Sequence, residues 1–227
     1  MRETAVALLE RNAAHAEQFC DRFDDLQDAQ HPDAVTVSCA DSRVLQDHVW
    51  GNDDPGHLFT CANIGNRVVQ QTDAGEVVSG DVLYPLVHTG TETVVVLGHT
   101  GCGAVTATYD ALTGAIDDEP PGIAHCVTLL APHLRPGVEM LPDDLDRPAA
   151  INHLVEYNVD RQIAVLAESD AVPASVQLVG AVYDFQDVYG GRRGEAHVVN
   201  VDGERDSGIL CEAHPEVAAR IDRRWAY

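Results

Sequence analysis

The sequence contains no lysine: all 14 of its basic residues are arginine, set against 37 aspartate and glutamate residues. The resulting formal net charge of −23 repels nucleic acid and anionic lipid, so we expect neither as a partner. No apolar run approaches the roughly 20 residues that a membrane-spanning helix needs. The first eleven residues carry charge throughout and lack the apolar core of a signal peptide, which predicts a cytoplasmic protein.

The acidic excess itself favours one kind of environment. An acidic surface hydrates strongly, and its self-repulsion is screened at high ionic strength. We therefore interpret the composition as that of a protein from a halophilic cytoplasm rather than as an acidic binding function.

Cysteines are few, six in 227 residues, which is too sparse for a disulfide scaffold. In a reducing compartment, a cysteine beside a histidine indicates metal binding or catalysis. Four of the six have no such companions, and we expect them to be small core residues: Cys20, Cys61, Cys126 and Cys211.

The length and the apolar fraction of 45% predict one globular domain over residues 1–227. Strands alternating with helices predict an α/β fold with a largely parallel central sheet flanked by helices. We expect a helical arm at 1–30, either docked on the domain or packed on a second subunit, followed by an α/β core and C-terminal helix at 34–227. The expected strands are 34–38, 58–62, 94–98, 175–183 and an edge strand at 196–201. The expected helices are 73–87, 104–112, 123–131, 149–168 and one from 215, with loops at 114–122 and 132–148.

Two short motifs follow two of these strands. Residues 39–43 read Cys-Ala-Asp-Ser-Arg, and residues 99–103 read His-Thr-Gly-Cys-Gly. Side chains alternate in an extended segment, so Cys39, Asp41 and Arg43 share one face. His99 and Cys102 are separated by a glycine-containing turn that lets both close on one ion. Both motifs end strands, where open α/β sheets place their active sites.

Two thiolates and an imidazole suit tetrahedral zinc, and three protein ligands leave the fourth position to water, as in catalytic sites. Cys102 also lies near a predicted helix N-terminus, which lowers a thiol pKa. Asp41 is placed to orient the zinc-bound hydroxide, and Arg43 to hold Asp41 ionised. Without Arg43, Asp41 would be a conditional fourth ligand of the Zn²⁺ ion.

These two motifs, about sixty residues apart, resemble the signature motifs of the β-class carbonic anhydrases. The resemblance implies that Cys39, His99 and Cys102 bind zinc and that Asp41 and Arg43 form the catalytic dyad. It also implies reversible hydration of CO2 to bicarbonate by zinc-bound hydroxide. The family fold implies a homodimer or higher oligomer, with the N-terminal arm at the subunit interface.

Further positions resemble the substrate pocket of the open-site, plant-like subtype of that family. They are Gln30, which we expect to come from the partner subunit, with Phe59, Tyr84 and the Gly103 region. Phe59 and Tyr84 would shape an apolar pocket suited to an uncharged linear molecule.

Two positions depart from the other subtype, in which Asp closes the zinc site and bicarbonate regulates it. Thr36 stands where that subtype has a tryptophan, and Ala62 stands where an arginine precedes Asn63. We therefore expect an open site without a bicarbonate switch. The missing arginine at Ala62 also departs from the family at large and leaves the geometry of the following loop open.

Two alternatives remain. The same zinc site would serve a hydrolase of carbonyl sulfide or carbon disulfide, because the same nucleophile attacks either carbon. A structural zinc module would instead need four protein ligands, with Asp41 bound to the metal.

Overall fold

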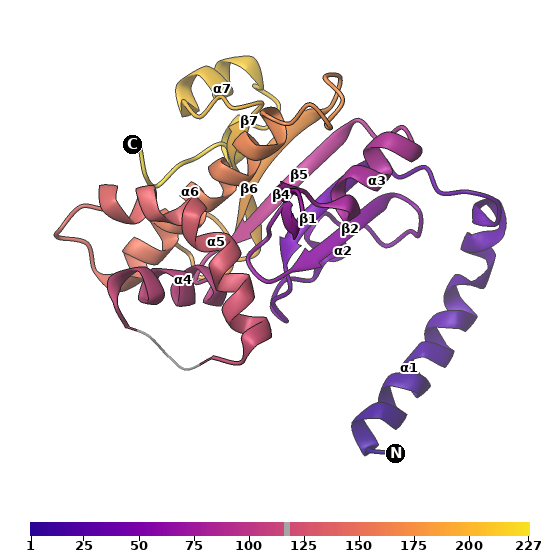
Figure 1. The fold of residues 1–227 in the computed structure, drawn as a ribbon. Helices are drawn as coiled ribbons and strands as arrows, with labels where there is room; N and C mark the ends of the chain where they lie inside the picture. The colour runs from indigo at the N-terminus through magenta and orange to yellow at the C-terminus, as the bar shows by residue number, and fades with distance from the viewer. Residues whose placement is uncertain (116–118) are drawn as a thin grey trace.

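The computed structural model describes residues 1–115 and 119–227, and its centre is a five-stranded sheet (Figure 1). The strand order is β2-β1-β5-β6-β7, with the first four strands parallel and β7 antiparallel to β6. The strands are β1 (Ala34–Cys39), β2 (Leu58–Asn63), β5 (Thr93–His99), β6 (Gln177–Asp184) and β7 (Glu195–Val201). The predicted α/β fold, with its parallel core and antiparallel edge strand, is confirmed.

The central strands are built from small branched residues that are covered on both faces. Val35 and Val37 of β1 and Val94 and Val96 of β5 are fully buried, as a parallel sheet between helices requires. β1 and β5 are in parallel register from Val35 opposite Val94. This register brings the carboxyl ends of both strands, and hence both sequence motifs, to one edge of the sheet.

The helices are α1 (Glu3–Phe19), η1 (Cys20–Leu26), α2 (Gln46–Val49), α3 (Gly80–His88), α4 (Gly103–Thr113), α5 (Pro121–Met140), α6 (Arg147–Ala167), α7 (Ser207–Ala213) and η2 (Ala218–Arg220). Helix α6 packs on β5, β6 and β7 and buries apolar residues such as Leu154 and Ile163. Helix α1 projects away from the body of the molecule and buries no residue (Figure 1). None of the helices in the described ranges has the length and hydropathy needed to cross a bilayer.

The helix expected over 73–87 was wrong in its first part. A hairpin of β3 (Val69–Thr72) and β4 (Gly75–Val78) precedes α3 instead. Gly75 has φ +103°, and the Thr72 hydroxyl donates to its carbonyl, which closes the turn. Ser79 then starts α3, because its Oγ accepts from the Asp81 amide.

The loop expected over 132–148 was wrong except at 141–146, because α5 continues to Met140 and α6 begins at Arg147. Pro132 and Pro136 lie inside this helix although each removes a backbone donor. Helix α5 packs against α4 and α6, and it buries Leu130 and Leu134 completely, so packing outweighs the lost hydrogen bonds. Within the other expected loop, 114–122, residues 116–118 lie outside the described residues, and α5 already begins at Pro121.

The helix expected from residue 215 was wrong as well. Helix α7 lies before that position, and Asp206 begins it by accepting from the Ile209 amide at 3.0 Å. After it the chain forms only the short helix η2 and then an irregular segment, 222–227. That segment lies on α6, where Arg223 and Tyr227 bond to Asp160.

Candidate metal centre

The three predicted zinc ligands converge at the carboxyl edge of the sheet. Cys39 ends β1, His99 ends β5, and Cys102 is the residue just before α4. All three are buried, and their ligand atoms lie within 4.8 Å of one another. The two sulfur atoms are 3.8 Å apart.

This donor set fits zinc. Two sulfurs at about 2.3 Å from a tetrahedral zinc ion stand about 3.8 Å apart, which matches the observed separation. The Nδ1 atom of His99 lies 3.0 Å from the Thr100 carbonyl and donates to it, so Nε2 carries the lone pair. Nε2 is buried and has no hydrogen-bond partner among the described residues. A metal ion shared with the two sulfurs would satisfy this orphaned acceptor.

The two thiols share a proton. A hydrogen bond from the Cys102 thiol, together with the neighbouring His99 imidazole, lowers the pKa of Cys39 to about 5 despite its burial. The pKa of Cys102 is raised because it holds that shared proton and is buried. The first backbone amides of α4 act in the opposite direction, as the helix N-terminus predicts, but the neighbouring thiolate outweighs them. A metal ion held by both sulfurs would take the place of this proton.

Asp41 and Arg43 form a bidentate ion pair beside the cluster. Arg43 Nε donates to Asp41 Oδ1 at 2.9 Å, Arg43 Nη2 donates to Oδ2 at 2.7 Å, and the Arg43 amide also donates to Oδ1. These bonds hold the pKa of the Asp41 carboxyl well below its usual range. Asp41 Oδ2 lies 3.6 Å from His99 Nε2, so the carboxylate borders the three donor atoms.

Two residues at this edge were not found from the sequence. Phe185, directly after β6, lies under the Arg43 guanidinium at 4.5 Å and stacks on the His99 ring at 5.7 Å. Gln186 fills the space beside Gly101, where a Cβ would meet its side chain at 2.7 Å. Their only sequence signal is that they follow a parallel strand whose end lies beside the β5 end.

The predicted pocket residues do not join the metal cluster within one chain. Gln30 is exposed in the segment before β1. Phe59 and Tyr84 lie close together, with ring centroids 6.3 Å apart, and Tyr84 is half exposed. Phe59 pairs with Val35, four residues before Cys39, which is about 13 Å along the strand.

Gly103 is nearer the metal cluster, since it begins α4 directly after Cys102. It also lines a cavity of about 410 Å³ between α4 and α5, together with Thr106.

The loop after Ala62 closes without an arginine at that position. The Asn63 side chain donates to the Arg67 carbonyl and accepts from the Arg67 amide, both at 2.8 Å. Arg67 Nε then donates to the Ile64 carbonyl at 2.9 Å. Thr36, at the other departing position, is buried in β1.

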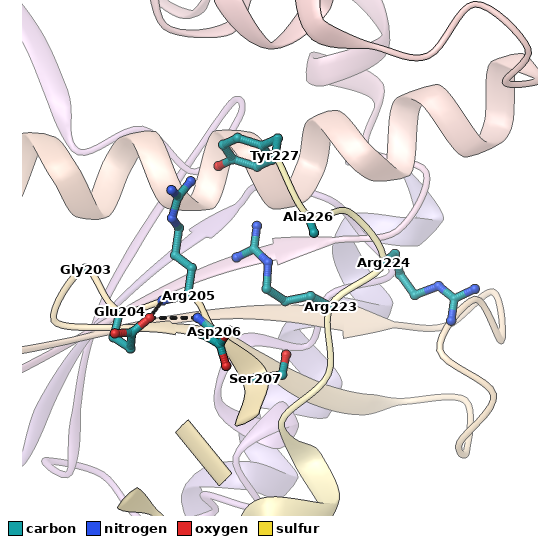
Figure 2. A pocket seen from close by; sticks show the side chains of 9 residues that line it. All are labelled: Gly203, Glu204, Arg205, Asp206, Ser207, Arg223, Arg224, Ala226 and Tyr227. Carbon is teal, nitrogen blue, oxygen red and sulfur yellow. Dashed lines mark hydrogen bonds between the residues drawn. The ribbon is translucent and has the colours of Figure 1, made fainter. Parts of the chain in front are cut away.

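A cavity of about 580 Å³ lies elsewhere, at the C-terminal segment, and its lining contains none of the metal-site residues (Figure 2). It is lined by Gly203, Glu204, Arg205, Asp206, Ser207, Arg223, Arg224, Ala226 and Tyr227. The Arg223 guanidinium there already donates to Asp160 and to the carbonyls of Val199 and Trp225. It therefore has little capacity left for a ligand.

The fold and the site together define a class of zinc enzymes. Its features are a mostly parallel α/β sheet, a buried Cys-His-Cys group at the carboxyl edge of that sheet, and an Asp-Arg pair beside the group. A family model described as carbonic anhydrase matches residues 34–191, more than half of the chain. The chain belongs to the carbonic anhydrase family, in its β class.

Relatives of known name belong to the same family. A carbonic anhydrase of Helicobacter pylori is 30% identical over 135 residues, 57% of this chain and 59% of that protein. A carbonic anhydrase of Pseudomonas aeruginosa is 29% identical over 206 residues, 87% of this chain and 86% of that protein.

Solved structures share the fold. The β-carbonic anhydrase CcaA superposes with a TM-score of 0.70 at 21% identity, covering 87% of this chain and 86% of that one. CafA of Aspergillus fumigatus superposes with a TM-score of 0.67 at 23% identity, covering 97% of this chain and 98% of that one.

Proposed function

We propose that the chain catalyses the reversible hydration of CO2 to bicarbonate at a zinc ion held by Cys39, His99 and Cys102. The observation that carries this proposal is the convergence of two sulfurs and one unpartnered imidazole nitrogen at tetrahedral spacing. Bound zinc supplies an acidified water, with a pKa lowered from about 15.7 toward about 7. Two thiolate ligands offset part of the metal charge, so neighbouring residues must contribute.

Asp41 and Arg43 make that contribution. Both Asp41 oxygens accept from Arg43, which keeps the carboxylate ionised and fixes its direction beside His99. Asp41 then accepts a hydrogen bond from the attacking water and aims its lone pair at the CO2 carbon. The Phe185 ring supports the Arg43 guanidinium from below.

We also place the chain in the open-site subtype. Among the described residues three donors group together rather than four, and both Asp41 oxygens are bonded to Arg43. Thr36 and Ala62 stand where the regulated subtype has tryptophan and arginine, so the proposal includes no bicarbonate switch.

The active form in this proposal is a homodimer or a higher homo-oligomer. Gln30, Phe59 and Tyr84 lie away from the metal site of their own chain and are available to a partner's site. Helix α1 leaves Leu8 and Leu9 exposed, which a second subunit would cover. A β-carbonic anhydrase of the same fold from Sordaria macrospora is described as tetrameric (TM-score 0.70, 21% identity).

The cellular setting in the proposal is a halophilic cytoplasm. The six cysteines are free, which suits a reducing compartment, and the net charge of −23 suits high salt.

The proposal is tested by CO2 hydration in a stopped-flow assay on purified protein with its zinc content measured. We expect one zinc ion per chain and a rate above the buffer alone. A strong chelator should abolish that rate, and added zinc should restore it. A protein that holds zinc but gives no zinc-dependent rate would contradict the proposed reaction.

A further inference from the structure

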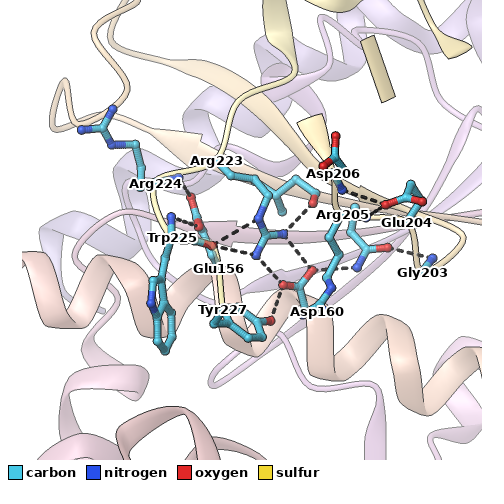
Figure 3. A network of polar contacts seen from close by, with 12 residues as sticks. Glu156, Asp160, Gly203, Glu204, Arg205, Asp206, Arg223, Arg224, Trp225 and Tyr227 are labelled. Carbon is cyan, nitrogen blue, oxygen red and sulfur yellow. Dashed lines mark hydrogen bonds and ion pairs between the residues drawn. The ribbon is translucent and has the colours of Figure 1, made fainter. Parts of the chain in front are cut away.

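Helix α6 carries buried amide side chains that reach the two loops beside the metal ligands. Asn152, Asn158 and Gln162 are 8%, 1% and 0% exposed, and all three bond to groups outside their own turn of helix or to one another. Two carboxylates of the same helix, Glu156 and Asp160, instead hold the C-terminal segment (Figure 3). The amides therefore have a different structural role from the carboxylates.

Asn152 fixes the short turn between two of the ligands. Its Oδ1 accepts from the Gly101 amide at 2.9 Å, and Gly101 lies between His99 and Cys102. Gly101 has φ +62°, so a side chain there would be strained, and its Cβ would also displace the end of the Gln186 side chain. The bond from Asn152 holds this left-handed residue from the side of α6.

Asn158 fixes the turn after Asn63, the residue that lies opposite the third ligand, Cys39, in the sheet. Its Nδ2 donates to the Gly65 carbonyl at 3.1 Å and to the Asn66 side chain at 3.2 Å. Gly65 and Asn66 both have positive φ, 86° and 44°. Gly65 adopts this conformation freely, but at Asn66, which has a side chain, it persists only when its surroundings hold it. The turn follows directly on Asn63, which lies opposite Cys39 in the β1–β2 pair and whose carbonyl accepts from the Ala40 amide at 2.9 Å. Gln162 in turn donates to Asn158 Oδ1 at 3.3 Å and keeps the amide oriented.

We propose that Asn152 and Asn158 are positioning residues of the metal centre, one for the loop that carries Cys102 and one for the turn against Cys39. Neither side chain is itself a metal ligand; each acts through the backbone that it holds. The inference rests on the proposed zinc site. Outer partners of this kind typically change metal affinity by about 10- to 100-fold when they are removed.

The test is the rate at which zinc leaves the protein, followed with a colorimetric chelator. We expect Asn152→Leu to release zinc at least about tenfold faster than the parent, because the Gly101 amide loses its acceptor. Asn152→Asp keeps an oxygen at the same place, so it should recover most of the slow release. In cobalt-loaded protein, Asn152→Leu should also alter the thiolate-to-cobalt absorption, which a remote structural change would leave alone.

Asn200→Leu is the matched control. Asn200, in β7, is 2% exposed and also bonds to α6, through Asp160 at 2.7 Å. The other hydrogen bond of its side chain among the described residues, from the Gly203 amide, does not involve either loop. It should lower the unfolding midpoint while leaving zinc release unchanged. Equal zinc release from Asn152→Leu and the parent, or an equal increase in both leucine variants, would overturn the inference. A parent that binds no zinc would instead overturn the proposed function.

A measurement on the unaltered protein covers the case in which the leucine variant does not fold. In zinc-loaded protein, the Gly101 amide hydrogen should exchange at least about tenfold more slowly than in an unstructured peptide, because it is bonded to Asn152. Exchange at the unstructured rate would also refute the role of Asn152.

Discussion

At the scale of single residues, the shape of the Arg43 guanidinium matters as much as its charge. Lysine keeps the charge but offers no fork that grips both Asp41 oxygens. We expect Arg43→Lys to keep its zinc and to hydrate CO2 about 10- to 100-fold more slowly, because the carboxylate is no longer aimed. Zinc analysis and stopped-flow kinetics on the same sample measure both quantities.

Arg147→Lys provides the comparison for that variant. Arg147 also forms an ion pair with a carboxylate, that of Asp110, and donates to both of its oxygens. This pair is more exposed than the Arg43–Asp41 pair and includes no metal-site residue. Its hydration rate should equal that of the parent. Full activity in Arg43→Lys would show that the bidentate geometry is dispensable.

The residues that the sequence revealed are those whose chemistry is unusual. One strand is followed by a cysteine, an aspartate and an arginine on alternate positions, and a second strand by a histidine near another cysteine. This combination serves few purposes besides metal binding. Phe185 and Gln186 escaped notice because an aromatic residue or an amide after a strand is common. The roles of Gln30, Phe59 and Tyr84 stay predictions, since a single chain does not bring them to the metal.

At the scale of elements, the C-terminal segment is held on α6 by a buried ion pair. Asp160 and Arg223 are 5% and 8% exposed and are joined at 2.8 Å, and Asp160 also accepts from Tyr227 and Asn200 (Figure 3). Replacing one partner leaves an uncompensated buried charge. We expect Asp160→Ala to lower the free energy of unfolding by about 3–5 kcal/mol in urea titrations.

The control for Asp160→Ala is Asp110→Ala, which removes the more exposed ion pair between Asp110 and Arg147. It should cost less than about 1 kcal/mol, because solvent screens that pair and hydrates the remaining arginine. Similar losses in both variants would mean that burial does not decide the strength of these ion pairs.

Local sequence signals failed where packing decided the element. Pro132 and Pro136 predicted a loop, yet α5 runs through both because Leu130 and Leu134 between and beside them are buried. The hairpin at 69–78 was missed because its valines also fit a helical face, and only the Gly75 turn distinguishes the hairpin from a helix. By contrast, β1 and β5 were predictable, since continuous runs of buried branched residues have no helical alternative of that length.

At the scale of the whole molecule, α1 is an exposed apolar arm. Leu8 and Leu9 are each 59% exposed, and no residue of this helix is buried in its own chain. We expect Leu8→Asp with Leu9→Asp to reduce the mass measured by light scattering from an oligomer toward one chain. The same change at the exposed Val217, far along the chain from the arm, should not alter it. An unchanged oligomer in the double variant would place the interface elsewhere.

The charge of the whole molecule predicts how its stability responds to salt. With 37 carboxylates and 14 arginines, repulsion between like charges opposes the compact state at low ionic strength. The screening length falls from about 10 Å at 0.1 M salt to about 3 Å at 1 M, so added sodium chloride should remove most of this repulsion. We expect the thermal midpoint to rise by several degrees over that range, where about 1 kcal/mol corresponds to about 2–4 °C.

A charge-reduced variant separates screening from a general salt effect on apolar burial. Asp24, Asp25 and Asp28 are exposed and close together in the arm, and their replacement by asparagine removes three negative charges without emptying the core. The variant should be more stable than the parent at 0.1 M salt and should gain less as salt is added. If both proteins gain equally, the rise comes from salting-out of apolar surface. The acidic composition would then serve solubility, through hydration of the surface, and not the stability of the fold.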